Sequence, residues 1–426
     1  MSHAAITDVH AYQILDSRAD ATLFVEVTLD TGHKGGAAVP HEASTGRYEA
    51  QEIRDQSGLY RRGDVMRAVH VVNHVIRPVI LGLDSEQQDD IDHQLIAGDG
   101  TASKHRWGAN RILGVSLAVS AAAATYRNLP VYAYLNSHYS PGLPIPQMNV
   151  INGGVHADTK MPIQEFLLIP GGADSMQEAV AMGVDTYTVL KEILHQQGYR
   201  TTVGDEGGFA PEFADPREVF ELLILSIERA GYRPLRDIAL GIDVAASELF
   251  QNGRYAWYGH EVTAQELIAQ YETWVRDYPL ISIEDGLSED AWSDWAELMR
   301  EMPKHVNTVG DDIFVTNKER VKRGIRESAA SAVLIKLNQI GTLTETREVI
   351  AMTHDAGWDT MVSHRSGETC DTMMVDLAIA DGVRFIKAGA SQRGERVAKY
   401  NRLLLIEAMD SSLPFAGWGS ERVKGQ

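Results

Sequence analysis

Short apolar runs alternate with longer amphipathic runs along the second half of the chain. The short runs cover 237–243, 279–285, 306–312, 331–338, 359–366 and 383–389, and the helical runs between them include 264–278, 291–302, 317–329, 343–357 and 372–382. Regular alternation of strand and helix predicts a parallel sheet, and this many units predicts a (β/α) barrel. A doubly wound open sheet is the competing architecture, but no glycine fingerprint follows the first strand.

The first part of the chain has a mixed pattern, which indicates a separate domain. Residues 21–40 read as two strands around a turn at Asp30-Thr31-Gly32, and helical patterns follow over 64–80 and 110–126. The segment 136–149 is rich in Pro, Ser and Asn, which is typical of a domain boundary. We therefore expect an N-terminal α+β capping domain over 1–140 and a barrel domain, the catalytic one, over 141–426.

Each short apolar run has an ionisable residue at or near its end. In chain order these residues are Asp243, Glu284, Asp311, Lys336, His364 and Lys387. Because the carboxyl ends of barrel strands surround one mouth, we expect the six side chains to meet there. One charged strand end is ordinarily just solvated, but six in phase favour a shared site.

The types of these residues indicate the chemistry of the site. Asp243, Glu284 and Asp311 are carboxylates without a nearby Cys or His cluster, and all-oxygen ligation favours Mg²⁺, with Mn²⁺ as second choice. Lys336 lies inside an apolar run, where an ammonium group is costly unless it is stabilised. A neighbouring dicationic metal lowers the pKa of a lysine, so we expect Lys336 to be a general base. Together they suit abstraction of a proton α to a carboxylate.

Such a reaction also needs an acid for the leaving group and a clamp for the substrate. Glu206 precedes Gly207-Gly208. Two glycines without side chains let the backbone lie close to another group, such as a bound ligand. The run "MPIQEFLLIP" offers Gln164 and Glu165. The run "HRSGE" places Arg365 and Ser366 beside His364, and an arginine with a backbone N–H suits a phosphate group.

Composition narrows the class of protein. The 39 Lys and Arg against 59 Asp and Glu leave a net charge of −20, which disfavours nucleic acid or an anionic membrane as the main partner. One cysteine, Cys370, excludes an internal disulfide framework. The N-terminus has no apolar signal core, and no segment reads as a membrane span. We expect a soluble cytoplasmic protein.

Several motifs in order resemble the enolase family. They are "ILDSR", "ASTGRYEA", "GAN" with "ILGVSLAV", "MNVINGGVHAD", "QEF", "GDEGGFAP", "SIEDGLSED", "GDDIFVTN", "IKLNQIGTLTET", "SHRSGET" and "ERVAKYNRLL". The resemblance covers nearly the whole chain. It implies a phosphopyruvate hydratase with a TIM-like barrel and two Mg²⁺ per active site. It also implies a homodimer or higher homo-oligomer that dehydrates 2-phospho-D-glycerate, a phosphorylated three-carbon acid, in glycolysis.

The resemblance also implies a role for each matching residue. Asp243, Glu284 and Asp311 would bind the first Mg²⁺, Ser44 the second together with the substrate phosphate. Lys336 would be the base at C2, and Glu206 with Glu165 would serve the departing hydroxyl. The remaining site residues would be His156 on a closing loop, Gln164 at the substrate, His364 as a further catalytic residue, Arg365 and Ser366 on the phosphate and Lys387 on the carboxylate.

The chain departs from the family pattern at several motifs. The usual DSRGNPT, PSGAST and GETED stand here as residues 16–22, 40–45 and 367–371 with substitutions. His41 and Glu42 change the loop that carries Ser44. They motivate an alternative, a paralogue resembling carboxyphosphonoenolpyruvate synthase of phosphonate natural-product pathways. Phe24 and Leu405 replace a family ion pair across the dimer interface, and apolar groups can replace such a pair without loss of stability.

A third reading is a non-catalytic binding or structural protein with the enolase fold. It is disfavoured because every metal and acid–base position of the family pattern is present in this sequence. A relative that had lost catalysis should have lost at least one of them.

Overall fold

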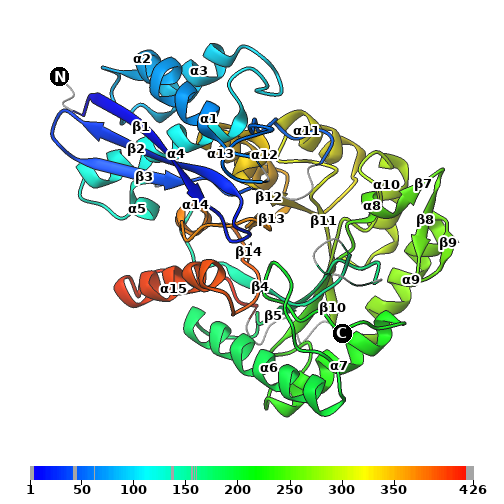
Figure 1. Cartoon of the computed structure of the whole chain (residues 1–426). Coiled ribbons are helices and arrows are strands. Elements are labelled where there is room, and N and C mark those ends of the chain that lie inside the picture. Colours follow the sequence, from blue (N-terminus) through cyan, green and yellow to red (C-terminus); the bar gives the residue numbers. More distant parts are fainter. Residues whose placement is uncertain are drawn as a thin grey trace.

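The computed structural model describes residues 4–41, 46–61, 63–135, 139–154, 157, 159 and 161–418. Figure 1 shows an N-terminal part, coloured blue to cyan, beside a barrel that the rest of the chain forms. The N-terminal sheet is antiparallel in the order β1 (Ile6–Leu15), β2 (Ala21–Leu29) and β3 (Lys34–Ala38). The turn between β2 and β3 is the predicted one, and Gly32 there has a φ of 83°. Strand β1 was not predicted.

Helices complete the N-terminal part. They are α1 (Met66–Val71), the π-helix η1 (Val72–Ile76), α2 (Arg77–Ile80), α3 (Gln88–Asp99), α4 (Ala109–Tyr126) and α5 (Val131–Leu135). Helix α4 is buried on almost every side, which accounts for its Ala- and Ser-rich sequence. A Cβ on Gly35 would lie 2.0 Å from the backbone nitrogen of Ala122, so glycine there lets β3 approach α4 closely.

The barrel contains eight strands and is closed. They are β4 (Ile145–Asn152), β5 (Glu165–Ile169), β6 (Ala239–Asp243), β10 (Leu280–Glu284), β11 (Asn307–Gly310), β12 (Ala332–Ile335), β13 (Asp359–Ser363) and β14 (Phe385–Lys387). They pair in the order β10-β11-β12-β13-β14-β4-β5-β6. All six predicted barrel strands are present, and the doubly wound open sheet is excluded.

Two details of the barrel differ from the sequence prediction. Strand β5 is antiparallel to both β4 and β6, so the sheet is not purely parallel. The chain goes from β4 to β5 within 153–164, where the described residues hold no crossover helix, and a direct return produces an antiparallel pair. The predicted boundary segment 136–149 also contains the start of β4, whose apolar residues are buried despite its prolines.

Helices surround the barrel. They are α6 (Met176–Gln196), α7 (Pro216–Arg229), α8 (Ala246–Leu249), α9 (Ala264–Asp277), α10 (Trp292–Glu301), α11 (Lys318–Glu327), α12 (Leu337–Ile340), α13 (Leu343–Asp355), α14 (Met373–Ala380) and α15 (Gly394–Met409). A small sheet of β7 (Phe250–Gln251), β8 (Arg254–Trp257) and β9 (His260–Val262) follows α8. Among the described helices, none combines the length and hydrophobicity that a membrane crossing requires.

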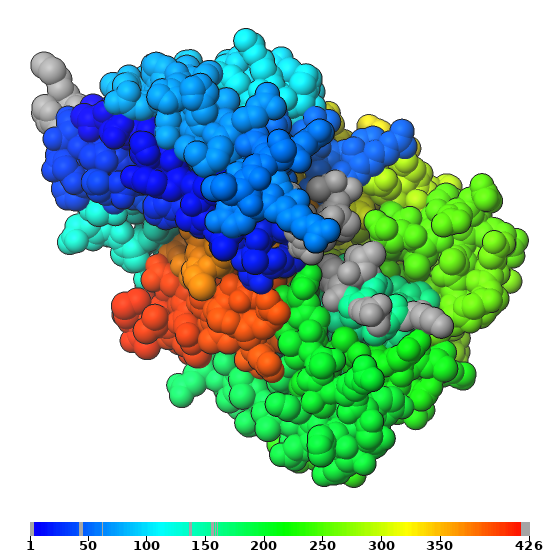
Figure 2. Space-filling model, in the orientation of Figure 1, coloured from blue at the N-terminus to red at the C-terminus, as the bar shows by residue number. Residues whose placement is uncertain are grey.

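The interior of the barrel and the N-terminal part position the site. Apolar side chains from the strands, with Trp418, fill the barrel interior as one cluster, so the barrel is a packed core rather than a pore. Figure 2 shows the blue N-terminal part lying directly against the barrel segments. The Ala50 N–H donates to the Gln339 carbonyl at 2.8 Å, which joins the segment after β3 to the barrel mouth.

Candidate active site

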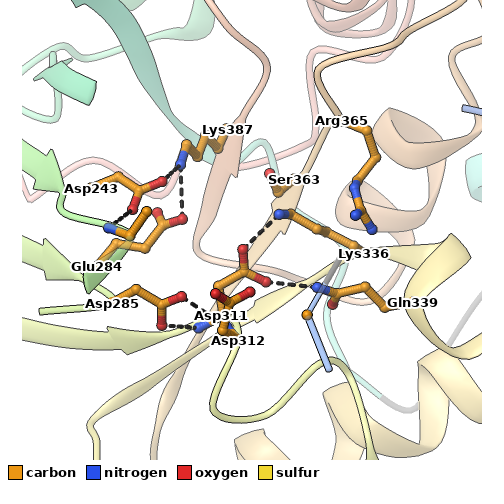
Figure 3. Close-up of polar contacts among 12 residues, drawn as sticks. Asp243, Glu284, Asp285, Asp311, Asp312, Lys336, Gln339, Ser363, Arg365 and Lys387 are labelled. Carbon is orange, nitrogen blue, oxygen red and sulfur yellow. Dashed lines mark hydrogen bonds and ion pairs between the residues drawn. The ribbon is translucent and has the colours of Figure 1, made fainter. Parts of the chain in front are cut away.

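One cavity at the carboxyl end of the barrel strands collects most of the predicted site residues. The predicted residues that line it are Gln164, Glu165, Glu206, Asp243, Asp311, Lys336, His364, Arg365 and Lys387. Asp243, Glu284 and Lys387 end their strands, and Asp311, Lys336 and His364 follow theirs by one residue. The predicted convergence at one mouth is therefore present in the fold (Figure 3).

Lys387 binds carboxylates from three different strands. Its Nζ lies 2.9 Å from Asp243 Oδ2, 2.8 Å from Glu284 Oε1 and 3.0 Å from Glu165 Oε2. Burial by itself would lower the pKa of Lys387, yet these carboxylates raise it well above its usual value. Burial and the neighbouring Asp243 raise the pKa of Glu284 well above its usual value. The site therefore holds more negative charge than one ammonium group neutralises.

Lys336 forms the second lysine–carboxylate pair. Its Nζ donates to Asp311 Oδ2 at 2.6 Å, and Gln339 Nε2 donates to Asp311 Oδ1 at 2.8 Å. Burial would raise the pKa of Asp311, but the pairing with Lys336 brings it below its usual value. The Lys336 backbone N–H donates to Thr316 Oγ1, whose own hydroxyl donates to Gln339 at 2.8 Å. This network fixes where strand β12 ends and directs the amine toward the cavity.

A second acidic group lies beside this pair. Oxygens of Asp285, Asp311 and Asp312 lie within 4.8 Å of one another, close enough for one metal ion. Asp285 accepts the backbone N–H groups of Asp311 and Asp312 at 2.9 Å each. Burial and mutual repulsion raise the pKa values of Asp285 and Asp312 well above their usual range. Among the described residues this is the closest acidic set, and it shares only Asp311 with the predicted metal ligands.

One of the predicted metal ligands, Glu284, nevertheless has an oxygen available to a cation. Glu284 Oε2 is buried and has no hydrogen-bond partner in the described part of the chain, while Glu284 Oε1 faces Lys387. An orphaned buried carboxylate oxygen is costly, and a hard divalent cation is the group that satisfies it. The donor set, made of carboxylate oxygens only, fits Mg²⁺.

Glu206 has a structured environment suited to proton transfer. Asn149 Nδ2 donates to Glu206 Oε2 at 2.9 Å, and His364 Nε2 lies 3.3 Å from the same oxygen. Arg396 donates to His364 Nδ1, so Nδ1 is the acceptor and the proton of the neutral ring resides on Nε2. Burial lowers the pKa of His364 to about 4. His364 is thus a neutral ring whose Nε2 lies next to the Glu206 carboxylate.

The two residues predicted to bind a phosphate group, Arg365 and Ser366, have different surroundings. Arg365 lines the cavity and is buried, with its guanidinium held by Glu49 and by Asn338. Ser366 Oγ accepts from Arg18 Nη1 at 3.0 Å. Ser366 is not among the residues that line the cavity.

His41 is bound within the protein. Its Nδ1 lies 2.6 Å from Glu52 Oε2, and its backbone pairs in both directions with Gly367 at 2.7 and 2.8 Å. The Glu52 carboxylate is buried, yet pairing with His41 brings its pKa below the usual value. Any contact between a cationic His41 and a substrate head group, which would favour the paralogue alternative, would have to break this pair.

Two predicted site residues, Ser44 and His156, lie outside the described residues, as does Glu42. Several lining residues were not predicted, namely Glu49, Ala245, Glu248, Asp285, Asp312 and Ser363. Asp285 and Asp312 each follow a predicted metal ligand directly, in the motifs "IEDG" and "GDD". The two adjacent acidic residues in each motif could have indicated that both members belong to the site. Glu49 lies in the motif "ASTGRYEA" and carried no comparable signal.

Comparison with known proteins agrees with this architecture along the whole chain. Residues 6–135 match the family described as "Enolase, N-terminal domain", and residues 140–423 match "Enolase, C-terminal TIM barrel domain". The chain belongs to the enolase family. A protein named "Enolase" from Acidothermus cellulolyticus is 51% identical over 415 residues, which is 97% of each chain. "Enolase 2" of Pseudomonas syringae pv. tomato is 49% identical over 406 residues, covering 94% of this chain and 95% of its own.

The enolase assignment confirms the barrel class and the activity that the motifs indicated. Because both parts of the chain match the enolase family models, the chain is an enolase-type hydro-lyase, that is, a phosphopyruvate hydratase. The paralogue and the non-catalytic readings are not favoured, because the similar proteins are enolases at about half identity over nearly the full length. The acidic set of Asp285, Asp311 and Asp312 at the mouth could hold a metal ion.

Proposed function

We propose that the chain catalyses the reversible, Mg²⁺-dependent dehydration of 2-phospho-D-glycerate to phosphoenolpyruvate. The observation that carries this proposal is the single cavity that Lys336, Glu206, Lys387 and Arg365 line together with carboxylates of three strands. These groups are a base, an acid, a carboxylate clamp and a phosphate clamp. A β-elimination from a phosphorylated hydroxy acid needs all four.

Two Mg²⁺ ions per site belong to this proposal. Asp243, Glu284 and Asp311 would hold the first ion, and Ser44 would hold the second with the phosphate. The unpaired Glu284 Oε2 and the all-oxygen donor set support the first assignment. Bound Mg²⁺ would neutralise the carboxylates that now hold both lysines and would stabilise added negative charge on the substrate carboxylate.

The protein's own side chains would carry the proton transfers. Lys336, as a neutral amine, would remove the C2 proton, and Lys387 would hold the substrate carboxylate beside it. Glu206, with Glu165, would deliver a proton to the departing hydroxyl, and His364 and Asn149 would orient Glu206. General acid and base catalysis of this kind contributes roughly 10²- to 10⁴-fold each.

The substrate-binding assignments complete the proposal. Arg365 and Ser366 would bind the phosphate, Gln164 would line the opposite end of the substrate, and His156 would act from its loop. The Gln164 backbone N–H donates to the Asp243 carbonyl at 2.9 Å, which supports Gln164 as a fixed wall of the cavity. The domain division at residue 140 also remains part of the proposal.

We place this activity in the cytoplasm, in glycolysis or gluconeogenesis, and in a homodimer. Exposed apolar side chains support self-association: Tyr12 and Leu15 on β1 are each 46% exposed, and Leu405 on α15 is 57% exposed. Strand β1 and helix α15 lie on the same side of the molecule in Figure 1. A dimer would cover both.

The direct test uses purified protein with Mg²⁺ and 2-phosphoglycerate. Formation of the enol product is followed by its ultraviolet absorbance, with a metal-free sample as control. Steady product formation that requires Mg²⁺ supports the proposal. A folded protein that forms no product from 2-phosphoglycerate in excess Mg²⁺ would overturn it.

A further inference from the structure

The guanidinium of Arg365, the proposed phosphate ligand, is already bound by an anion of the protein. Arg365 Nη1 lies 3.2 Å from Glu49 Oε2, and Nη2 lies 3.2 Å from both Glu49 oxygens. Both side chains are buried, at 2% and 6% exposure. A buried arginine needs a counter-charge, and in this structure Glu49 supplies it.

Glu49 comes from a different part of the chain than Arg365. It lies in the segment after β3, while Arg365 follows β13 in the barrel, 316 residues later. Its Oε1 also accepts the Gly46 N–H at 3.0 Å and Gln339 Nε2 at 3.3 Å. Glu49 lines the same cavity as Lys336 and Asp311, so it stands inside the substrate site rather than behind it.

The Glu49–Arg365 contact is weak for an ion pair of this burial. Charge-assisted bonds between a guanidinium and a carboxylate are normally about 2.7 to 2.9 Å long, and all three contacts here measure 3.2 Å. Glu49 also faces other carboxylates, because it is among the groups that raise the pKa of Asp312. Repulsion from Asp311 and Asp312 therefore offsets part of the attraction to Arg365.

Arg365, by contrast, is held firmly from its other side. Nη1 donates to Asn338 Oδ1 at 2.9 Å, and the Arg365 backbone N–H donates to Glu368 Oε1 at 3.1 Å. Asn338 in turn donates to Glu52 Oε1, although at 3.4 Å. The guanidinium therefore has an anchor, Asn338, that does not involve Glu49.

We propose that Glu49 is a place-holder anion that the substrate's phosphate group must displace from Arg365. This proposal rests on the proposed function, since it takes Arg365 as a phosphate ligand. A phosphate dianion has more charge and more acceptor oxygens than one carboxylate, so it can replace Glu49 where a neutral group cannot. Glu49 thereby makes the site selective for phosphorylated acids over the same acids without phosphate, at a cost in affinity.

The test measures binding of inorganic phosphate to the full chain without metal, by titration calorimetry under mildly alkaline conditions. Glu49→Gln keeps the shape of the side chain and removes its charge. One charged contact corresponds to roughly 10- to 100-fold in affinity, so the Kd for phosphate should fall by about that factor. Glu52→Gln is the matched control, because Glu52 acts on Arg365 only through space and through Asn338, so its effect should be several-fold smaller.

Variants at Arg365 separate this inference from the proposed function. Arg365→Gln should abolish phosphate binding, and the double variant with Glu49→Gln should bind no better than Arg365→Gln alone. Unchanged phosphate binding in Arg365→Gln would overturn the phosphate role of Arg365 and the inference with it. Lost binding in Arg365→Gln, combined with unchanged or weaker binding in Glu49→Gln, would overturn the inference alone.

A second variant with a shorter carboxylate side chain, Glu49→Asp, tests the inference if Glu49→Gln does not fold properly. Glu49→Asp keeps the charge but cannot reach both guanidinium nitrogens, so it should bind phosphate more tightly than the wild type. Wild-type affinity in a folded Glu49→Asp protein counts against the inference.

Discussion

At the residue scale, the site joins two lysines to an excess of buried carboxylates. Lys336 is paired with Asp311 and Lys387 with Asp243 and Glu284. Each lysine can leave its carboxylate only if another cation takes its place, so the chemistry of the amines and the binding of cations are coupled. The residues therefore act as one charged network, and single substitutions test which member carries which step.

Lys336→Ala should abolish removal of the C2 proton, because the other lysine at the mouth, Lys387, is held by three carboxylates. Exchange of the C2 proton of 2-phosphoglycerate with solvent deuterium isolates this step from dehydration. We expect the exchange rate to drop by at least the roughly 10²-fold typical of a lost general base. Exchange at the wild-type rate would remove Lys336 from the role of base.

Glu206→Gln should stop dehydration while it leaves part of the C2 exchange, because the proton leaves before the hydroxyl. The loss in turnover should be roughly 10²- to 10⁴-fold, as for a general acid. Comparing exchange with product formation in one sample separates the two steps. If the variant forms product at the normal rate, Glu206 is not the acid.

His364 should make the metal-free protein less stable in acid. Its folded pKa of about 4 lies below the usual 6.5, so the unfolded chain takes up the proton more readily. The stability it contributes is complete above pH 6.5 and is lost as the pH falls toward 4, by about 3 kcal/mol in total. Urea unfolding of wild type and His364→Gln across this range should show a shallower slope in the variant.

The exposed His195 on α6 provides the control for this measurement. His195→Gln should keep the wild-type dependence of the unfolding free energy on pH. Identical slopes in wild type and His364→Gln would show that the neutral ring at position 364 does not couple to folding.

At the scale of elements, the barrel strands deliver acidic side chains to one mouth. Strands β6 and β10 end in Asp243 and Glu284, and β11 is followed at once by Asp311 and Asp312. Neighbouring parallel strands of a barrel end at the same edge, so the fold brings these carboxylates together even though they repel one another. Their mutual repulsion is a folding cost that a bound cation would remove.

Mg²⁺ should therefore raise the stability of the folded chain and be required for turnover. A ligand that binds only the folded state at 100 times its Kd stabilises it by about 2.7 kcal/mol. Calorimetric melting with EDTA and with Mg²⁺ measures this, and Asp311→Asn should lose the shift while Asp277→Asn, at the exposed end of α9, should keep it. Full turnover in EDTA, with metal absent by elemental analysis, would contradict the metal assignment.

At the scale of the whole molecule, the site exists only where the N-terminal part meets the barrel. Glu49 and Glu52 come from the N-terminal part, and both reach side chains of the barrel mouth. Arg18, from the turn after β1, likewise reaches Ser366. Loss of this contact between the two parts would remove the environment of Arg365 even if the barrel stayed folded.

The apolar residues exposed on the surface bear on self-association of the whole molecule. Phe24 lies beside Tyr12 on the N-terminal sheet, with ring centroids 6.4 Å apart, and Leu405 is exposed on α15. No charge at these two positions is available for salt to screen, so the proposed dimer should be insensitive to salt at the Phe24–Leu405 contact. Phe24→Glu should weaken it, by burying an unpaired charge. Sedimentation across a salt series measures both effects.

Phe250→Glu, on β7 at the far side of the molecule in Figure 1, is the matched control and should sediment as wild type. Equal dimerisation of Phe24→Glu and wild type would exclude the N-terminal sheet from the interface.

The sequence by itself determined the class of the fold and which residues lie together at the candidate site. Alternating runs predicted the barrel, because hydrophobic period reports local secondary structure directly. The ionisable strand ends predicted the mouth, since Asp243, Glu284 and Lys387 end strands whose direction the alternation already implied. Motif resemblance supplied the roles, and the family match agrees with the reaction class.

Only the tertiary structure decided which charges meet. Strand β5 runs antiparallel to β4 because the chain returns directly from one strand to the other. The pattern of hydrophobic positions does not predict the path of such a connection. His41 turns to Glu52 rather than to a substrate, and Arg365 is bound by Glu49 from 316 residues away. Such pairs depend on how the N-terminal part sits on the barrel. A local pattern cannot report them, because the energy of an ion pair depends on distance and burial in space and not on separation along the chain.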